Sequence, residues 1–183
     1  MFVAAWAVLG ARSRGYDPTR DAISTLAEVD ATTRPMMTAG LIVLGTGMAL
    51  YSEGLRRGLG GPAWTSALAN GVATLGVAAL PLNSGYDTAH GVAAGLGYAT
   101  LAAIPVLAAP RSSGPRWMST ATGIAAGLCL AASVAGDWRT GLLQRLGLTV
   151  AQAWVVASAV SLVRRPRSSS TPPPAPAPVA RRR

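Results

Sequence analysis

His90 is the only histidine in the chain and the residue type best suited to chemistry. It follows Asp87 by three residues, at the end of the polar segment 83–90. Residues spaced by three lie on one face of a helix, so the imidazole would be within reach of the carboxylate. Such a pair can act as an acid, a base or a pH sensor. Asp87 or Thr88 could also cap the helix that follows. We therefore expect either a functional pair or a histidine that bonds a neighbour at a helix end.

The segment 136–145 is the second concentration of polar residues, and it contains Asp137, Arg139 and Arg145. Asp137 and Arg139 are close enough in sequence to pair with each other. Arg145 stands at the start of an apolar run, where the dipole of a helix disfavours a positive charge. We therefore expect Arg145 to have a carboxylate partner or a ligand.

The polar segment 12–34 contains Asp21, Ser24, Thr25 and Glu28. Thr25 and Glu28 have the spacing of a capping box, which predicts a short interfacial helix beginning at Thr25. Asp21 could cap that helix instead. Ser24 is the hydroxyl that could join His90 and an aspartate in a metal-free hydrolytic site, although nothing in the surrounding sequence marks it as a nucleophile.

The elements that would position these residues are apolar. Half of the 183 residues are hydrophobic and 13% are charged, whereas a soluble domain has about a quarter charged residues. A helix needs about 20 residues to cross a bilayer. Five charge-free runs meet or approach this length, and they predict spans at 35–52, 64–82, 90–109, 117–135 and 146–163.

Residues 1–11 are apolar but reach only about 16 Å as a helix. We expect them to be the second half of a first span whose beginning lies upstream of Met1. The predicted fold is therefore all-α, a polytopic membrane bundle of about six transmembrane helices with the first one truncated, over residues 1–163. Residues 164–183 are rich in Arg and Pro and predict a disordered tail.

The distribution of arginine predicts the orientation. The loops 52–63 and 110–116 and the tail together carry ten Arg and one acid, Glu53. The opposite side carries six Arg and the other six acids. Because Arg accumulates on the cytoplasmic side, we expect a multi-pass protein of the cell membrane with both termini in the cytoplasm.

Several classes of protein do not fit this sequence. The Arg residues lie in short loops between apolar runs, so a nucleic-acid partner is not expected. The single cysteine, Cys129, excludes an intramolecular disulfide. Membrane hydrolases similar to alkaline ceramidases place Ser, Asp and His at one membrane face, but they bind zinc through several His. One histidine cannot build such a site, so we expect no metal and no cofactor.

The order and spacing of three polar segments resemble those of the bacterial domain-of-unknown-function family 998. The segments are Tyr16 with the run 23–26, Pro81 followed by His90, and the run 141–145 followed by Trp154. The resemblance covers about residues 1–163 and implies a small multi-pass membrane protein with no established reaction. It marks Ser24, His90 and Arg145. The chain departs from the family pattern in its shortened first span and its added tail.

These observations predict a polar cluster at the non-cytoplasmic membrane boundary, which binds a small molecule, a lipid or a partner. Its predicted members are Ser24, Asp87, His90, Asp137 and Arg145. A membrane-embedded hydrolase that uses Ser24, His90 and an aspartate is the alternative, and a small transporter is a third hypothesis. The small-residue patterns 91–95 and 123–127 are suited to close helix contacts, within the chain or in a homo- or hetero-oligomer.

Overall fold

The computed structural model describes residues 2–112, 114–136 and 139–164. These residues form six α-helices and one short 3₁₀ helix, η1 (Ile23–Ala27). The α-helices are α1 (Phe2–Arg12), α2 (Arg34–Gly58), α3 (Ala63–Ala79), α4 (Asp87–Ala108), α5 (Arg116–Val134) and α6 (Thr140–Arg164). The predicted all-helical bundle is confirmed. Asp137 and the predicted disorder of the tail from residue 165 onward lie outside the described residues.

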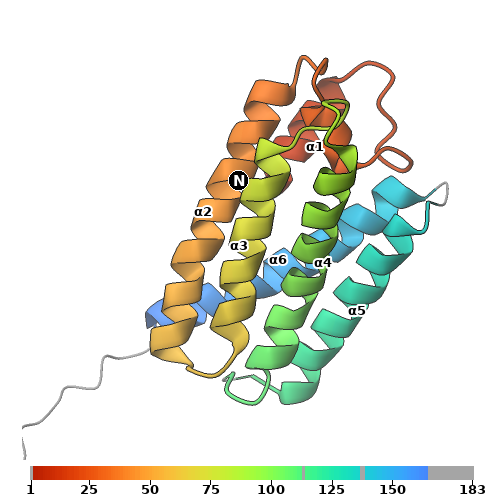
Figure 1. The fold of residues 1–183 in the computed structure, drawn as a ribbon. Coiled ribbons are helices and arrows are strands. Elements are labelled where there is room, and N and C mark those ends of the chain that lie inside the picture. Colours follow the sequence, from red (N-terminus) through yellow and green to blue (C-terminus); the bar gives the residue numbers. More distant parts are fainter. Residues whose placement is uncertain (1, 113, 137–138, 165–183) are drawn as a thin grey trace, which may run out of the picture.

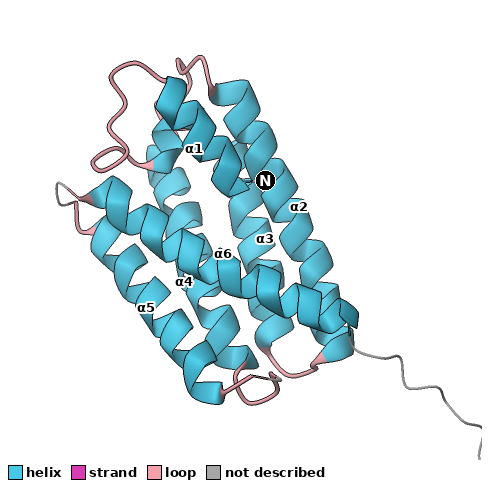
Figure 2. Cartoon of the chain, turned by 180° about the vertical axis from the view of Figure 1, so that it is seen from behind, coloured by secondary structure: helices cyan, strands magenta, loops and turns pink. Residues whose placement is uncertain are grey.

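The helices α2, α3, α4 and α5 lie side by side in chain order and form one layer (Figure 1). The helices α1 and α6 lie on one face of this layer, and α6 crosses it diagonally (Figure 2). The helix η1 contacts α1, α2 and α6. It lies at the end of the bundle where α2, α4 and α6 begin, which we call the η1 end.

Four of these helices, α2, α4, α5 and α6, are long and apolar enough to cross a membrane. Their outward faces carry large apolar side chains such as Leu50, which is 73% exposed, and Leu128, which is 67% exposed. The helix α3 has 17 residues and ends at Ala79, three residues before the predicted end of its span. Pro81 explains the difference, because a proline disfavours helical conformation in the residue before it.

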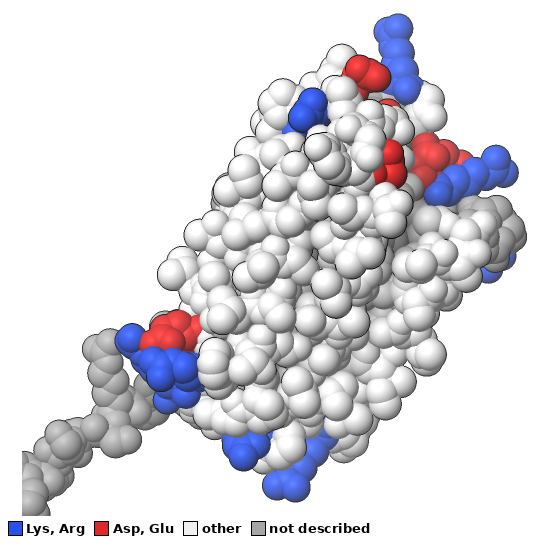
Figure 3. Space-filling model, viewed as in Figure 1, with Lys and Arg blue, Asp and Glu red and all other residues white. Residues whose placement is uncertain are grey.

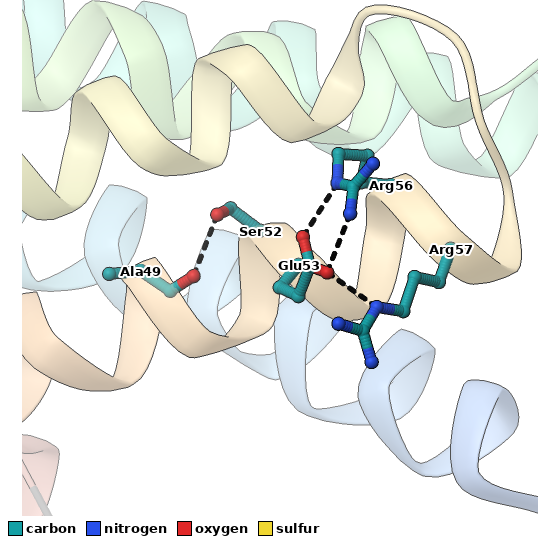
Figure 4. Close-up of polar contacts among 5 residues, drawn as sticks. All are labelled: Ala49, Ser52, Glu53, Arg56 and Arg57. Atoms are coloured by element: carbon teal, nitrogen blue, oxygen red, sulfur yellow. Dashed lines mark hydrogen bonds and ion pairs between the residues drawn. The ribbon is translucent and has the colours of Figure 1, made fainter.

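Charged side chains gather at the two ends of the bundle, and the surface between them is uncharged in the view of Figure 3. At the end opposite η1, Glu53 accepts hydrogen bonds from Arg56, 2.6 Å from Nε to Oε2 and 2.8 Å from NH2 to Oε1, and another from Arg57 (Figure 4). Glu53 is the one acid on the predicted cytoplasmic side. The arginines at that end outnumber this one acid, so the end has a net positive charge.

Close approach of helix backbones depends on glycine at two contacts. A Cβ on Gly71 would lie 2.7 Å from the carbonyl oxygen of Gly45, and one on Gly123 would lie 2.5 Å from that of Ala102. The pattern 123–127 therefore does pack against α4. A Cβ on Gly91 or on Gly95 would meet no atom within 4 Å, so the pattern 91–95 makes no such contact within the described chain.

Candidate functional site

A cavity of about 80 Å³ lies between α2, α3, α4 and α6, beside η1 and Phe2 of α1. The wall formed by α2 is apolar and consists of Met37, Leu41 and Leu44. The other walls carry polar but uncharged side chains. They are Ser24, Asn70, Thr74, His90, Tyr98, Gln144 and Gln152.

The His90 side chain lines this cavity and is 5% exposed. Its Nδ1 lies 2.6 Å from the carbonyl oxygen of Leu80. A carbonyl oxygen can only accept a hydrogen bond, so Nδ1 carries the proton, and in the neutral ring Nε2 is then an acceptor. The Leu80 carbonyl needs a partner because α3 has just ended there.

The predicted pair of His90 with Asp87 is wrong. Asp87 is exposed, and its Oδ1 accepts a hydrogen bond from the backbone N–H of Asn83 at 2.8 Å. The prediction that Asp87 or Thr88 caps α4 is also wrong, because the N-cap is Tyr86 and no side chain caps the helix. Asp87 is instead the first residue of α4, where a negative charge is favourable to the helix dipole.

The predicted capping box is wrong as well. The short helix is η1, which begins at Ile23 rather than at Thr25. The Thr25 hydroxyl donates to the carbonyl oxygen of Ala22 at 2.9 Å. The Glu28 carboxylate accepts a hydrogen bond from the side chain of Asn83 at 3.1 Å, across to the α3–α4 loop. This contact between distant segments takes the carboxylate away from the backbone that a capping box would require.

Gln144 connects η1 to α4 across the cavity. Its Oε1 accepts a hydrogen bond from the backbone N–H of Ile23 at 2.7 Å, and its Nε2 donates to the hydroxyl of Tyr98. Gln144 is 5% exposed. The sequence prediction did not place Asn70, Tyr98, Gln144 or Gln152 in the site. The available signal was the presence of amide side chains in or beside apolar runs, where polar groups are costly.

Several polar groups around the cavity have hydrogen-bonding capacity that no described residue uses. The Nε2 atom of Gln152 is buried without a partner. The Ser24 hydroxyl makes no hydrogen bond to the described part of the chain, and no described residue accepts the hydroxyl hydrogen of Tyr98. The Nε2 atom of His90 adds a fourth such group. Of these four, Gln152 Nε2 is the fully buried one, and buried polar groups normally have partners. The cavity is therefore a place where another molecule can supply a partner.

Arg145 lies beside Gln144 but points to the loop that precedes η1. It is 7% exposed, and its NH1 donates to the carbonyl oxygens of Pro18 (2.7 Å), Asp21 (3.0 Å) and Gly141 (2.8 Å). Its NH2 donates to the hydroxyl of Tyr16. The guanidinium carbon also lies 5.2 Å from the centre of the Trp6 ring and 5.4 Å from that of Tyr16, distances typical of cation–π contacts.

The expected carboxylate partner of Arg145 is not found among the described residues, none of which forms an ion pair with it. Carbonyl dipoles and aromatic faces stabilise the charge instead. The Tyr16 hydroxyl accepts from Arg145 and donates to the carbonyl of Ala22 at 3.2 Å. Burial raises the pKa of Tyr16 above its ordinary value, which keeps the hydroxyl able to donate.

Backbone contacts fasten the same loop to the first turn of α6. The N–H groups of Gly141 and Leu142 donate to the carbonyl oxygens of Arg20 (3.2 Å) and Thr19 (3.0 Å). The first N–H groups of a helix have no partner within it, and here the loop supplies them. Arg145 and this backbone pairing together hold the chain that leads into η1 over the cavity.

The predicted site residues are thus only partly brought together. Ser24 and His90 line the cavity, Arg145 supports the loop beside it, and Asp87 is at the surface. The position of Asp137 is outside the described residues. Within 2–112, 114–136 and 139–164, no group of three His, Cys, Asp or Glu side chains could hold a metal ion.

The fold and the position of the cavity define the class of protein to which this chain belongs. The chain is a multi-helix membrane protein, with apolar helices long enough to span and, between them, a largely apolar cavity that contains several uncharged polar side chains. It belongs to the family described as protein of unknown function DUF998, whose model matches residues 1–161. No curated protein and no solved structure matches the chain.

Proposed function

We propose that this protein binds the uncharged, hydrogen-bonding part of an amphipathic molecule in the cavity between α2, α3, α4 and α6. The observation that carries the proposal is the group of four unused hydrogen-bonding positions on Ser24, His90, Tyr98 and Gln152. An unpaired polar group in a membrane interior is costly, and such groups mark binding sites. A ligand that carries a hydroxyl, ester or amide would satisfy them.

The absence of charged side chains in the cavity indicates that the part of the ligand inside it is uncharged. None of the described residues that line the cavity is Asp, Glu or Arg. A buried charge without a partner costs several kcal/mol, on the order of the penalty for an unpaired ion inside a protein. An ionised group would therefore not enter, and the portion of the ligand inside the cavity is neutral.

The size and depth of the cavity indicate an elongated ligand. Drug-sized ligands occupy sites of about 300–1,000 Å³, so the cavity of about 80 Å³ accommodates only a slender portion of such a molecule. Gln144 and Gln152, both on α6, are eight residues apart, which corresponds to about 12 Å along a helix. The polar side chains thus extend inward from the η1 end. A lipid that enters from the membrane boundary could contact them along its length. We propose that this end faces away from the cytoplasm.

The experiment that tests this proposal compares His90 variants by mass spectrometry of the intact protein released gently from membranes. The wild type should retain an amphipathic molecule of defined mass. His90→Asn keeps a donor for the Leu80 carbonyl but removes the second ring nitrogen. This variant should be as stable as the wild type and should lose the bound molecule.

His90→Ala separates a structural role from a binding role. It removes both ring nitrogens, so it should lose the bound molecule and also some thermal stability. If His90→Asn restores both stability and the bound molecule, His90 serves only to hold the end of α3, and binding through its ring is excluded. Thr65→Ala is a suitable control, because Thr65 is exposed, lies outside the cavity and its hydroxyl bonds only the carbonyl of Pro62.

A further inference from the structure

A second depression lies at the η1 end, on the outer side of η1, and we call it the outer crevice. It is formed by the end of α1, by the loop that follows and by the turns before α2, and it has a volume of about 690 Å³. Ile23 and Ser24 line the internal cavity, whereas Thr25 and Leu26 line the outer crevice. The helix η1 is therefore a partition between the two.

The outer crevice presents charges of both signs. Arg12 and Arg14 line it, and so do Asp21, Glu28 and Asp30. Figure 3 shows acidic and basic side chains close together at this end. None of the ion pairs among the described residues joins these two arginines to these three acids. Asp21 and Glu28 each accept one hydrogen bond, from the backbone N–H of Asp17 and from the Asn83 side chain, and their remaining lone pairs stay open to a ligand.

The walls of the crevice are held by hydrogen bonds to residues outside it and by one between two of its own lining residues. Arg145 bonds the Tyr16 hydroxyl and the Asp21 carbonyl, and Asn83 bonds the Glu28 carboxylate. The Thr33 hydroxyl donates to the carbonyl of Leu26 at 2.8 Å. Because the loops are fixed before any ligand arrives, binding has a smaller entropic cost.

We propose that the outer crevice binds a zwitterionic group that carries a phosphate and an ammonium. Arg12 and Arg14 would take the phosphate, because guanidinium groups match the geometry of phosphate oxygens. Asp30, together with Asp21 and Glu28, would take the ammonium. Such a group can come from a zwitterionic phospholipid headgroup or from a soluble phosphorylated amine. The site is separate from the internal cavity and does not depend on what the cavity binds.

The test is a binding titration of the full chain in neutral detergent with phosphoethanolamine, inorganic phosphate, ethanolamine and a short-chain phosphatidylethanolamine. The zwitterion should bind more tightly than phosphate or ethanolamine alone. The double variant Arg12→Gln with Arg14→Gln should lower the affinity for the zwitterion at least about tenfold, as expected for the loss of hydrogen bonds between charged groups. Asp30→Asn should weaken binding of the zwitterion and leave the affinity for inorganic phosphate unchanged.

Arg20→Gln is the matched control, because Arg20 lies at the same end, is exposed and does not line the crevice. It should change affinity by no more than about twofold, as for a screened surface charge. An equal effect of Arg20→Gln and the double variant would overturn the proposal, as would equal affinities for phosphate and the zwitterion. His90→Asn should leave this titration unchanged. Tighter binding of the short-chain lipid than of phosphoethanolamine would identify a headgroup, and equal binding would identify a soluble ligand.

Discussion

The side chain of Gln144 bonds the backbone N–H of Ile23 at 2.7 Å, across 121 positions of sequence. This contact ties the start of η1 to α6 at the boundary of the internal cavity. The neighbouring Arg145 holds the carbonyl oxygens of the preceding loop. Two consecutive residues of α6 therefore hold the chain that closes the η1 end of the bundle.

Gln144→Leu should destabilise the protein, because it leaves the buried N–H of Ile23 without a partner. The expected cost is about 1–3 kcal/mol, measured as a lower unfolding temperature in detergent, with faster hydrogen exchange at Ile23. Gln152→Leu is the control on the same helix. Its amide Nε2 has no described partner, so the variant should be at least as stable as the wild type. Equal loss in both variants would contradict the role assigned to Gln144.

Arg145→Lys should loosen the loop before η1 although the charge is kept. A lysine ammonium is a point charge that cannot replace the planar fork of the guanidinium between several acceptors and two rings. The free energy of unfolding should fall by roughly 1–3 kcal/mol, and limited proteolysis within 13–22 should become faster. Arg34→Lys is the comparison, since Arg34 makes one long bond of 3.4 Å to the carbonyl of Val29. If Arg145→Lys is as resistant to proteolysis as Arg34→Lys, the loop is held by other contacts.

Gly123→Ala should separate α5 from α4, because the added methyl would lie 2.5 Å from a backbone oxygen of α4. Overpacking of this kind costs about 1–3 kcal/mol, visible as reduced thermal stability and lower abundance in the membrane. Gly91→Ala introduces the same methyl where no atom lies within 4 Å, so it should be neutral. A destabilising Gly91→Ala would indicate that the outer face of α4 contacts another chain.

We also expect the end of the bundle that carries Arg56, Arg57 and Arg116 to face the cytoplasm, because basic loops are retained there. Reporter fusions after Arg57 and after Arg165 should both give cytoplasmic signals. A periplasmic-type signal at either position would contradict this orientation. The cavity would then open toward the cytoplasm.

Much of the fold was predictable from the sequence, because long runs without charge have few structural solutions other than membrane helices. The end of α3 shows a missed signal. Pro81 stops the helix at Ala79, and this exposes the Leu80 carbonyl that His90 then bonds. The sequence prediction paired His90 with Asp87 because it considered only neighbours on the same helix. The actual partner is Leu80, the residue that follows α3, and its position depends on how α3 packs against α4.

The site was less predictable for the same reason. Ser24 and His90 were expected, and both line the cavity, but Asn70, Tyr98 and Gln152 are polar residues in apolar helices with no motif around them. Their convergence depends on the rotation of three helices. Arg145 was expected to need a compensating group, and four oxygen atoms and two rings stabilise it. Backbone carbonyl partners cannot be identified from side-chain types.

The most direct test of ligand binding in the cavity is an experimental structure of the full chain in lipid nanodiscs prepared from its native membrane. We expect elongated density between α2, α3, α4 and α6, with a polar atom of the ligand within about 3.2 Å of Gln152 Nε2, the range of an N–H···O hydrogen bond. The same density should contact the Ser24 hydroxyl or His90 Nε2. A cavity that holds only separate water molecules bonded to these groups, or that is closed by rotated protein side chains, would contradict the proposed function.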